Sequence, residues 1–349
     1  MDSLTQATLG AAVGHLCWNE KIGKKALIAG ALLGTLPDLD IALYPFLDGV
    51  QRLYWHRGES HSVWFIVLGS MGFGWLLARL HAAQPLSMYR AGIGAFLVFT
   101  THIIIDLFTV YGTQLLAPLW RKGFSLNNMY IVDPLFTLPL LVGAVGAYLM
   151  KNRKAGSQLN QICLGLVSIY VIWSFTAQFV AEQKFHSALA KQNVTVSRQI
   201  TSAGPFTTFL WRYIAETPDG FLLGYWSWFD EKSKPVRFQF IPRNESVIDN
   251  IRETRTFRVV DWFSQGWWFV AESNGKIARV VDLRFGEIPS DKHQDVDQWD
   301  YPFAWNFSLV KEDETRLKPV LPKLKDPAAT LGLLLTRITG HGQWLSSPD

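Results

Sequence analysis

Long apolar runs fill the first half of the chain and are missing from the second half. A membrane-spanning helix needs about 20 mostly apolar residues, and the runs 62–80, 91–110, 131–150 and 162–181 match this length. Two shorter runs precede them and predict tilted or partial helices that form a hairpin; they cover residues 4–18 and 26–36. The pattern predicts a multi-pass α-helical membrane domain of about six helices.

After residue 183 the pattern changes to short segments separated by turn sequences. Turn sequences at 217–220 and 273–276 each lie between two apolar segments, so each predicts a β-hairpin. Such a pattern is typical of a soluble α+β domain with an antiparallel sheet. The expected elements are strands at 207–215, 221–229, 236–241, 267–272, 277–285 and 303–310, and a helix at 246–263.

The change in pattern divides the chain into three expected parts. Residues 1–183 form the helical membrane domain, and residues 184–325 form the soluble α+β domain. Residues 326–349 form a tail in which 328–338 fits a short amphipathic helix, and residues 319–326 fit a linker.

The composition agrees with a membrane protein and narrows the function classes. Hydrophobic residues make up 49% of the chain and charged residues 18%, against a usual charged share of about 25%. The net charge of +4 is too small to indicate nucleic-acid binding, so none is expected. Cys17 and Cys163 both lie in apolar segments, so no disulfide framework or Cys-based zinc site is expected. Asp2 stands where a signal peptide would carry basic residues, so we expect the N-terminus to be retained.

The Lys and Arg residues of the short loops predict the orientation of the helices. The side richer in basic residues is expected to be cytoplasmic, which places the N-terminus and residues 184–349 outside. The expected location is the inner membrane of a bacterium, with the soluble domain in the periplasm. The richer side carries Lys21, Lys24, Lys25, Arg79, Arg90, Lys151, Arg153 and Lys154, and the opposite side carries Arg52, Arg57, Arg121 and Lys122.

This topology brings most acidic and imidazole side chains of the membrane half to its outer face. His102 and Asp106 are four residues apart, so they share one face of a helix. An Asp near the middle of a membrane helix raises the free energy of membrane insertion by roughly 2.5–3.5 kcal/mol. Polar residues with separate structural roles would have no reason to converge on one face. The converging residues are Asp2, Asp38, Asp40, His56, His61, His102, Asp106 and Asp133.

Carboxylates and imidazoles are ligands of zinc, iron and manganese, so the set predicts a metal site. Structural alternatives stay open for its members. Asp2 and Asp133 fit helix N-caps, and Asp38 and Asp40 fit turn positions. The polar pair in the run 91–110 could simply join neighbouring helices by hydrogen bonds.

Six short stretches within residues 1–150 carry a resemblance to a known family; they are 1–6, 34–40, 56–62, 101–106, 111–114 and 131–134. In these stretches the chain resembles the membrane-bound metal-dependent hydrolase family named after YdjM. That family is thought to be distantly similar to zinc-dependent phospholipase C and single-strand nucleases, which are helical proteins with a metal cluster held by His and Asp. Many relatives carry His where this chain has Gln6, so the resemblance implies fewer or more weakly bound metals there. The ligands that the resemblance implies are Asp2, Asp38, His61, His102 and Asp106, with Asp40 as the alternative to Asp38.

Residues and resemblance together predict a metal-dependent hydrolase, with zinc as the expected divalent metal. Metal-activated water would attack an ester or phosphoester, including one linked to a lipid, and membrane lipid is the expected partner. A non-catalytic membrane protein with a structural or metal-binding cluster and a partner-docking soluble domain is the alternative. An ion or proton transporter would use the same intramembrane acids. The residues expected to act in catalysis are Asp38, Asp40, His56 and Arg57, the last of them to orient a phosphate or carboxylate.

Overall fold

The computed structural model describes residues 1–83, 86–192, 194–233, 235–273, 275–288, 300–309, 318–319 and 326–341. The chain forms two compact units. The first unit comprises Met1–Leu43 and Trp55–Thr176, and the second comprises Tyr44–Tyr54 and Ala177–Asp349. The predicted linker 319–326 lies outside the described residues except at its two ends.

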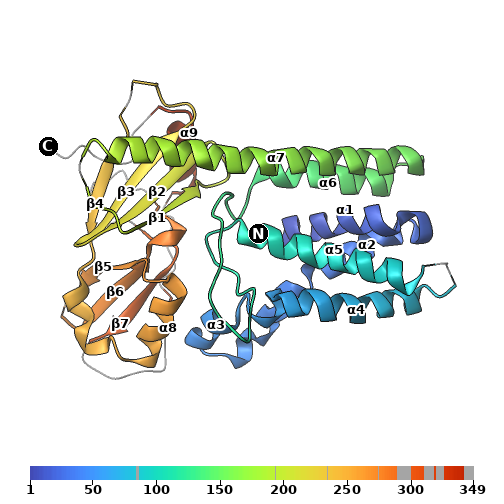
Figure 1. The fold of residues 1–349 in the computed structure, drawn as a ribbon, viewed down its shortest axis with the longest axis horizontal. Coiled ribbons are helices and arrows are strands. Elements are labelled where there is room, and N and C mark those ends of the chain that lie inside the picture. The colour runs from blue at the N-terminus through green and yellow to red at the C-terminus, as the bar shows by residue number, and fades with distance from the viewer. Residues whose placement is uncertain are drawn as a thin grey trace. The chain divides into compact units, whose positions relative to one another are not determined.

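Each of the six predicted apolar runs contains a helix (Figure 1). Among the described residues, three helices are long and apolar enough to cross a membrane: α4, α5 and α7. A fourth span is reached if α2 and η1, which meet at a bend of 48°, count as one broken span. The helices are α1 (Ser3–Ile22), α2 (Lys25–Thr35), η1 (Pro37–Phe46), α3 (Gly49–Trp55), η2 (Glu59–His61), α4 (Val63–Leu80), α5 (Met88–Leu107), α6 (Pro134–Leu149) and α7 (Arg153–Leu189).

Glycines allow α1 and α2 to pack at backbone contact. A Cβ atom built on Gly30 would lie 2.1 Å from the carbonyl oxygen of Gly10, and one built on Gly34 would lie 2.8 Å from the Cα of Gly10. Small residues let membrane helices approach this closely. The contact fixes the end of α2, from which the chain enters η1.

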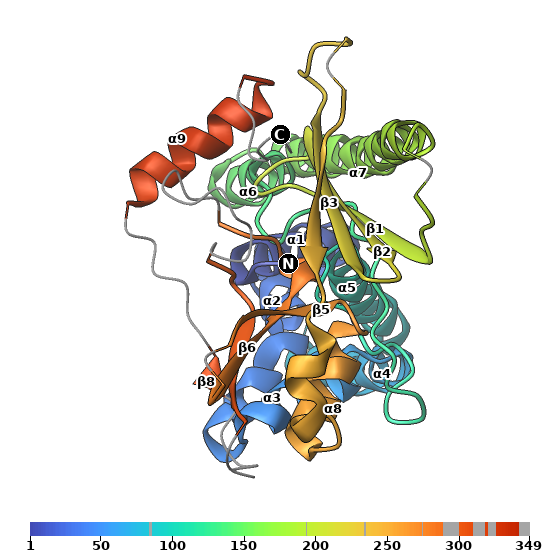
Figure 2. The same ribbon diagram turned by 90° about the vertical axis from the view of Figure 1, so that its left-hand side faces the viewer.

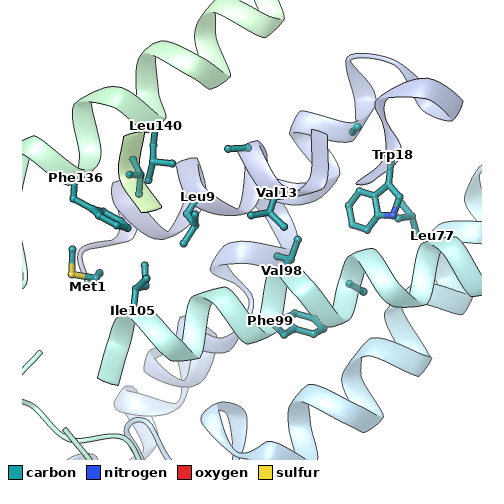
Figure 3. Close-up of a cluster of buried hydrophobic side chains, with 14 of the residues drawn as sticks. Met1, Leu9, Val13, Trp18, Leu77, Val98, Phe99, Ile105, Phe136 and Leu140 are labelled. Atoms are coloured by element: carbon teal, nitrogen blue, oxygen red, sulfur yellow. The ribbon is translucent and has the colours of Figure 1, made fainter. Parts of the chain in front are cut away.

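Large side chains fill the space between α1, α5 and α6 (Figure 3). Trp18 is fully buried, and its indole N–H donates to the carbonyl oxygen of Arg90 at 3.2 Å. Val98 and Phe99 on α5 and Leu140 on α6 are also fully buried. This apolar core holds α5 in place against α1, and α5 carries part of the site described below.

The described residues of the second unit form two four-stranded antiparallel sheets, where the sequence suggested one (Figures 1 and 2). Both predicted hairpins are present as β2–β3 and β5–β6. Strand β1 was not predicted because only Ile200 in it is a large apolar residue. The first sheet is β1 (Arg198–Ala203), β2 (Leu210–Thr217), β3 (Gly220–Ser227) and β4 (Phe238–Pro242), and the second is β5 (Trp268–Ser273), β6 (Ile277–Asp282), β7 (Ala304–Ser308) and β8 (Lys318–Pro319).

Helices complete the second unit, and the predicted helix at 328–338 is one of them. It forms α9 (Pro327–Ile338), which buries Leu334 in the core of this unit. Arg337 of α9 donates to both carboxylate oxygens of Asp230, at 2.7 and 2.9 Å. The helix predicted at 246–263 is present as η3 (Glu245–Ile251) and α8 (Arg255–Ser264), and η4 (Leu283–Phe285) follows β6.

Candidate metal centre

Four side chains from three elements converge in the first unit. Asp38 lies in η1 and His61 in η2, while His102 and Asp106 lie one turn apart near the end of α5. One ligand atom from each residue lies within 4.8 Å of the others. The cluster therefore gathers residues that are up to 68 positions apart, from Asp38 to Asp106.

The four ligand atoms form a compact set of nitrogens and oxygens. Nε2 of His61 lies 3.3 Å from Asp38 Oδ1, 3.2 Å from Asp106 Oδ2 and 3.3 Å from His102 Nε2. Nε2 of His102 lies 3.7 Å from Asp38 Oδ1 and 3.6 Å from Asp106 Oδ2. For metal–ligand bonds of about 2.0–2.1 Å, the edge of a coordination tetrahedron is about 3.3 Å. These five distances are close to that edge, and all four atoms lie within 4.8 Å of one another, so the set is compact enough for a four-coordinate metal site.

Hydrogen bonds orient both imidazoles toward the centre of the cluster. His102 donates from Nδ1 to the carbonyl oxygen of Gly34 at 2.6 Å, and Nδ1 of His61 lies 2.9 Å from Ser60 Oγ, which can accept its proton in a hydrogen bond. With the proton on Nδ1, each ring presents the lone pair of Nε2 to the other ligands. This is the tautomer that binds a metal through Nε2.

Asp106 uses its two carboxylate oxygens differently. Oδ1 accepts hydrogen bonds from Gln6 Nε2 at 3.0 Å and from the amino group of Met1, and it forms an ion pair with Arg57 Nη2 at 3.0 Å. Oδ2 is buried and has no hydrogen-bond donor among the described residues. Buried polar atoms are rarely left without a partner, so Oδ2 is the atom to which a cation would bind.

Gln6 supports the cluster and does not enter it. Its amide nitrogen donates to Asp106 Oδ1 at 3.0 Å and points toward the carbonyl oxygen of His102 at 3.4 Å. The resemblance implied weaker metal binding at this position because an amide is a poor ligand. In this structure the amide acts as a donor that holds Asp106, which a neutral imidazole could also do.

Asp40 and His56 form a second pair beside the four ligands. Both oxygens of Asp40 lie 3.1 Å from His56 Nδ1, and Oδ2 also accepts from the backbone N–H of Arg57 at 2.9 Å. Asp40 Oδ2 lies 4.0 Å from His61 Nδ1, on the side of that ring away from the cluster. Asp40 therefore orients His56 and stays outside the set of four ligand atoms.

Arg57 lies beside Asp106 with its guanidinium group buried. It contacts Asp106 Oδ1, donates to Thr109 Oγ1 at 3.0 Å, and lies 4.9 Å from the ring centre of Tyr111. Its φ of 53° is in the left-handed region, which is uncommon for a residue with a side chain. Such a conformation persists where the surroundings enforce it, and here it directs the side chain toward Asp106.

The structure does not bring Asp2 or Asp133 into the cluster. Asp2 caps α1, accepting from the backbone N–H of Thr5 at 3.0 Å. Asp133 caps α6, accepting from the N–H of Leu135 at 3.0 Å, and also accepts from the hydroxyl of Tyr170 at 2.8 Å. Both residues have the capping role that the sequence left open as an alternative.

The cluster opens on the side of Asp38 and His56. Their side chains are 19% and 18% exposed, whereas those of His61 and Asp106 are fully buried. Water or a substrate would therefore approach the ligand atoms past Asp38.

Sequence reasoning missed the groups that orient the ligands. Ser60 stood next to a predicted ligand, so adjacency could have suggested it. The carbonyl oxygen of Gly34 carries no side-chain signal, and only the fold shows that it faces His102.

Comparison with known proteins places the first half of the chain in a family. The family model described as YdjM inner membrane protein matches residues 1–181, which is just over half of the chain. The uncharacterized protein YfhP of Bacillus subtilis (strain 168) is 22% identical over 197 residues, covering 54% of this chain and 58% of that protein. The chain thus spans less than two thirds of the length of this relative. No solved structure matches the chain. The buried Asp–His–His–Asp cluster lies within the matched residues, and the chain belongs to the YdjM family of inner membrane proteins.

Proposed function

We propose that the protein is a membrane-bound, divalent-metal-dependent hydrolase that uses water to cleave an ester or phosphoester. One observation carries this proposal: four ligand atoms converge within 4.8 Å, and one of them, Asp106 Oδ2, is buried without a hydrogen-bond donor among the described residues. A polar pair that only joins neighbouring helices by hydrogen bonds would not need four such groups. The membrane family and the apolar helices support a location in the inner membrane.

The donor set fits a dication, and zinc suits it best. Two carboxylates and two neutral imidazoles carry a charge of about −2, which a divalent ion neutralises. Nitrogen and oxygen ligands in a four-coordinate arrangement are typical of zinc, whereas magnesium and calcium prefer six or more oxygens. A divalent metal here would act as a Lewis acid and would make water a nucleophile near neutral pH.

The ligands have different surroundings, and this divides their roles. His61, His102 and Asp106 are buried and oriented by neighbours, so they form a rigid three-ligand set of the kind found in catalytic zinc sites. Asp38 lies on the open side, where its carboxylate can leave or share its position and accept the proton of the attacking water. Arg57 holds Asp106 in position through Oδ1.

His56 completes the proposed machinery as a proton donor. Asp40 accepts a hydrogen bond from the N–H at Nδ1 of His56, so the role of proton donor falls to Nε2. An imidazole held in this way can protonate the leaving group. General acid catalysis typically raises the reaction rate by about 10²–10⁴-fold.

Replacing His56 with Gln is expected to lower kcat about 100-fold or more while the protein keeps its metal. The metal is expected to stay bound because His56 is not one of the four residues that supply ligand atoms. Metal analysis and steady-state kinetics of the same preparation separate the two effects. A variant that loses metal together with activity would show that His56 belongs to the ligand set instead.

The function itself is tested with para-nitrophenyl carboxylic esters, phosphomonoesters and phosphodiesters. The purified full-length protein is assayed as isolated, after removal of metal with a chelator, and after zinc is restored. We expect hydrolysis of at least one ester class, its loss on chelation and its recovery with zinc. Full zinc occupancy without hydrolysis of any class would overturn the proposal.

The fourth ligand favours one alternative function. Structural zinc sites are closed by four protein ligands, whereas catalytic sites keep one position for water. If Asp38 stays bound, the cluster is a structural metal site of a non-catalytic membrane protein. The Asp38→Ala variant distinguishes the two, because a structural site would lose stability without any activity to lose.

The orientation of the protein also belongs to the proposal. The distribution of Lys and Arg in the short loops supports a cytoplasmic location for the loop 151–154 and an outer location for the metal cluster. The second unit would then lie in the periplasm.

A further inference from the structure

The cluster lies at one end of two candidate membrane spans. His61 lies two residues before Val63, the first residue of α4. Asp106 lies one residue before Leu107, the last residue of α5. Helices α4 and α5 pack closely, since a Cβ on Gly74 would lie 2.5 Å from the Cα of Gly92. The ligands therefore lie near the depth at which a bilayer changes from hydrocarbon to headgroups, which is where the phosphoesters of lipids are found.

A hairpin at residues 113–124 is attached directly to the site. Its backbone closes through hydrogen bonds between Thr113 and Phe124, at 2.9 and 3.0 Å. Gln114 donates from its backbone N–H to the carbonyl oxygen of Arg57 at 3.0 Å and from its side chain to that of His56 at 3.3 Å. The hairpin is thus fixed to the loop that carries the proposed proton donor.

The tip of this hairpin is apolar and exposed. Leu119 is 78% exposed and Trp120 is 53% exposed, and Pro118 beside them is exposed as well. Lys122 Nζ lies 5.7 Å from the ring centre of Trp120. Trp with a neighbouring Lys is the combination that membrane proteins place at the level of the headgroups.

A second exposed apolar segment begins at the ligand Asp38. Leu39, Ile41 and Leu43 all expose about half of their side chains to the surroundings. Water-soluble surfaces rarely carry such a run, but a lipid chain would cover it. Apolar surface of η1 thereby begins at the open side of the cluster, and the base of the hairpin is bonded to the loop that carries His56.

We infer that the substrate is a long-chain lipid phosphoester taken from the bilayer, with its chain held by the tip of the hairpin 113–124 and by residues 39–43. The inference rests on the proposed hydrolase function and names its substrate class. Lys122 on the hairpin supplies positive charge for the phosphate, whereas Arg121 is paired with Glu59 and stiffens the hairpin. A water-soluble ester would gain nothing from either apolar segment.

The test compares two substrates with the same leaving group: a long-chain alkyl para-nitrophenyl phosphate in mixed micelles and methyl para-nitrophenyl phosphate. For the zinc-loaded full-length protein, we expect kcat/KM to be at least about 10-fold higher for the long-chain ester. The double variant Leu119→Ser/Trp120→Ser should remove this preference, with a much larger loss of kcat/KM on the long-chain ester than on the methyl ester. Equal rates for both esters, or an equal loss on both, would overturn the inference.

A matched control is available on α4. Trp75 and Leu76 are also an adjacent Trp–Leu pair, 48% and 41% exposed, and lie toward the other end of that helix. The variant Trp75→Ser/Leu76→Ser should keep the preference for the long-chain ester. If it also removed the preference, general loss of membrane contact would explain the effect and the inference would fail.

Binding separates this inference from the function on which it rests. Affinities of the zinc-loaded protein are measured for a long-chain alkyl phosphonate and for methyl phosphonate, which carry no cleavable ester. Tighter binding of the long-chain compound, weakened in the hairpin variant, supports the lipid site even if no ester is hydrolysed. Equal binding of both compounds overturns the lipid site even if the methyl ester is hydrolysed.

Discussion

Alanine in place of His102 is expected to abolish hydrolysis and to weaken zinc binding by more than about 100-fold. Loss of a group that only orients a metal ligand costs about 10–100-fold in metal affinity. Loss of the ligand itself is expected to cost at least as much. His102 Nε2 lies within 3.7 Å of both carboxylate ligands, so its removal leaves one side of the site open. Zinc affinity is measured by competition with a chelating dye, and activity is measured on the same sample.

The control for this variant is His81→Ala. His81 follows Leu80, the last residue of α4; its Nδ1 lies 3.0 Å from the carbonyl oxygen of Leu77, and it is not one of the four cluster residues. This variant should bind zinc as tightly as the wild type. Thermal unfolding without metal shows whether the His102 variant is folded, and a folded variant that still binds zinc tightly would exclude His102 as a ligand.

Alanine in place of Gly30 is expected to destabilise the first unit by about 3 kcal/mol, the upper range for overpacking. The added Cβ would lie 2.1 Å from the carbonyl oxygen of Gly10, so one of the two helix backbones must move. Gly34 follows one turn later on α2, and its carbonyl oxygen accepts the hydrogen bond from His102. The variant should therefore show both a lower unfolding temperature and weaker zinc binding.

Gly72→Ala is the matched control for this change. Gly72 lies inside α4 and a Cβ there would meet nothing within 4 Å. Alanine is the better helix former by about 1 kcal/mol, so this variant should be as stable as the wild type or more so. If the two variants had equal stabilities, the close contact between α1 and α2 would not contribute to folding.

The helices of the first unit could be predicted because their apolar runs are long and few. Each predicted run holds a helix, but α1 and α6 do not pass as spans, since α1 carries polar residues and α6 is short. In the second unit the hairpins were predictable from their turns. The edge strand β1 and the division into two sheets were not, because both depend on pairing between distant segments.

For the site, the sequence indicated which residues could converge but not how each one would be used. Asp38, His61, His102 and Asp106 are in the cluster, and Asp2 caps a helix instead. Arg57 was expected to face a substrate, yet its guanidinium is buried against Asp106. These differences arise from backbone geometry, including the left-handed conformation of Arg57 and the position of the Gly34 carbonyl, which no residue spacing encodes.

X-ray absorption spectroscopy of the purified protein loaded with zinc tests the metal centre most directly. We expect a single zinc ion per chain, bound by imidazole nitrogens and carboxylate oxygens at about 2.0–2.1 Å, with the imidazole signal reduced in the His102→Ala variant. A protein that retains no zinc after dialysis, or a zinc spectrum without imidazole ligands, would contradict the assignment of Asp38, His61, His102 and Asp106 as one metal site.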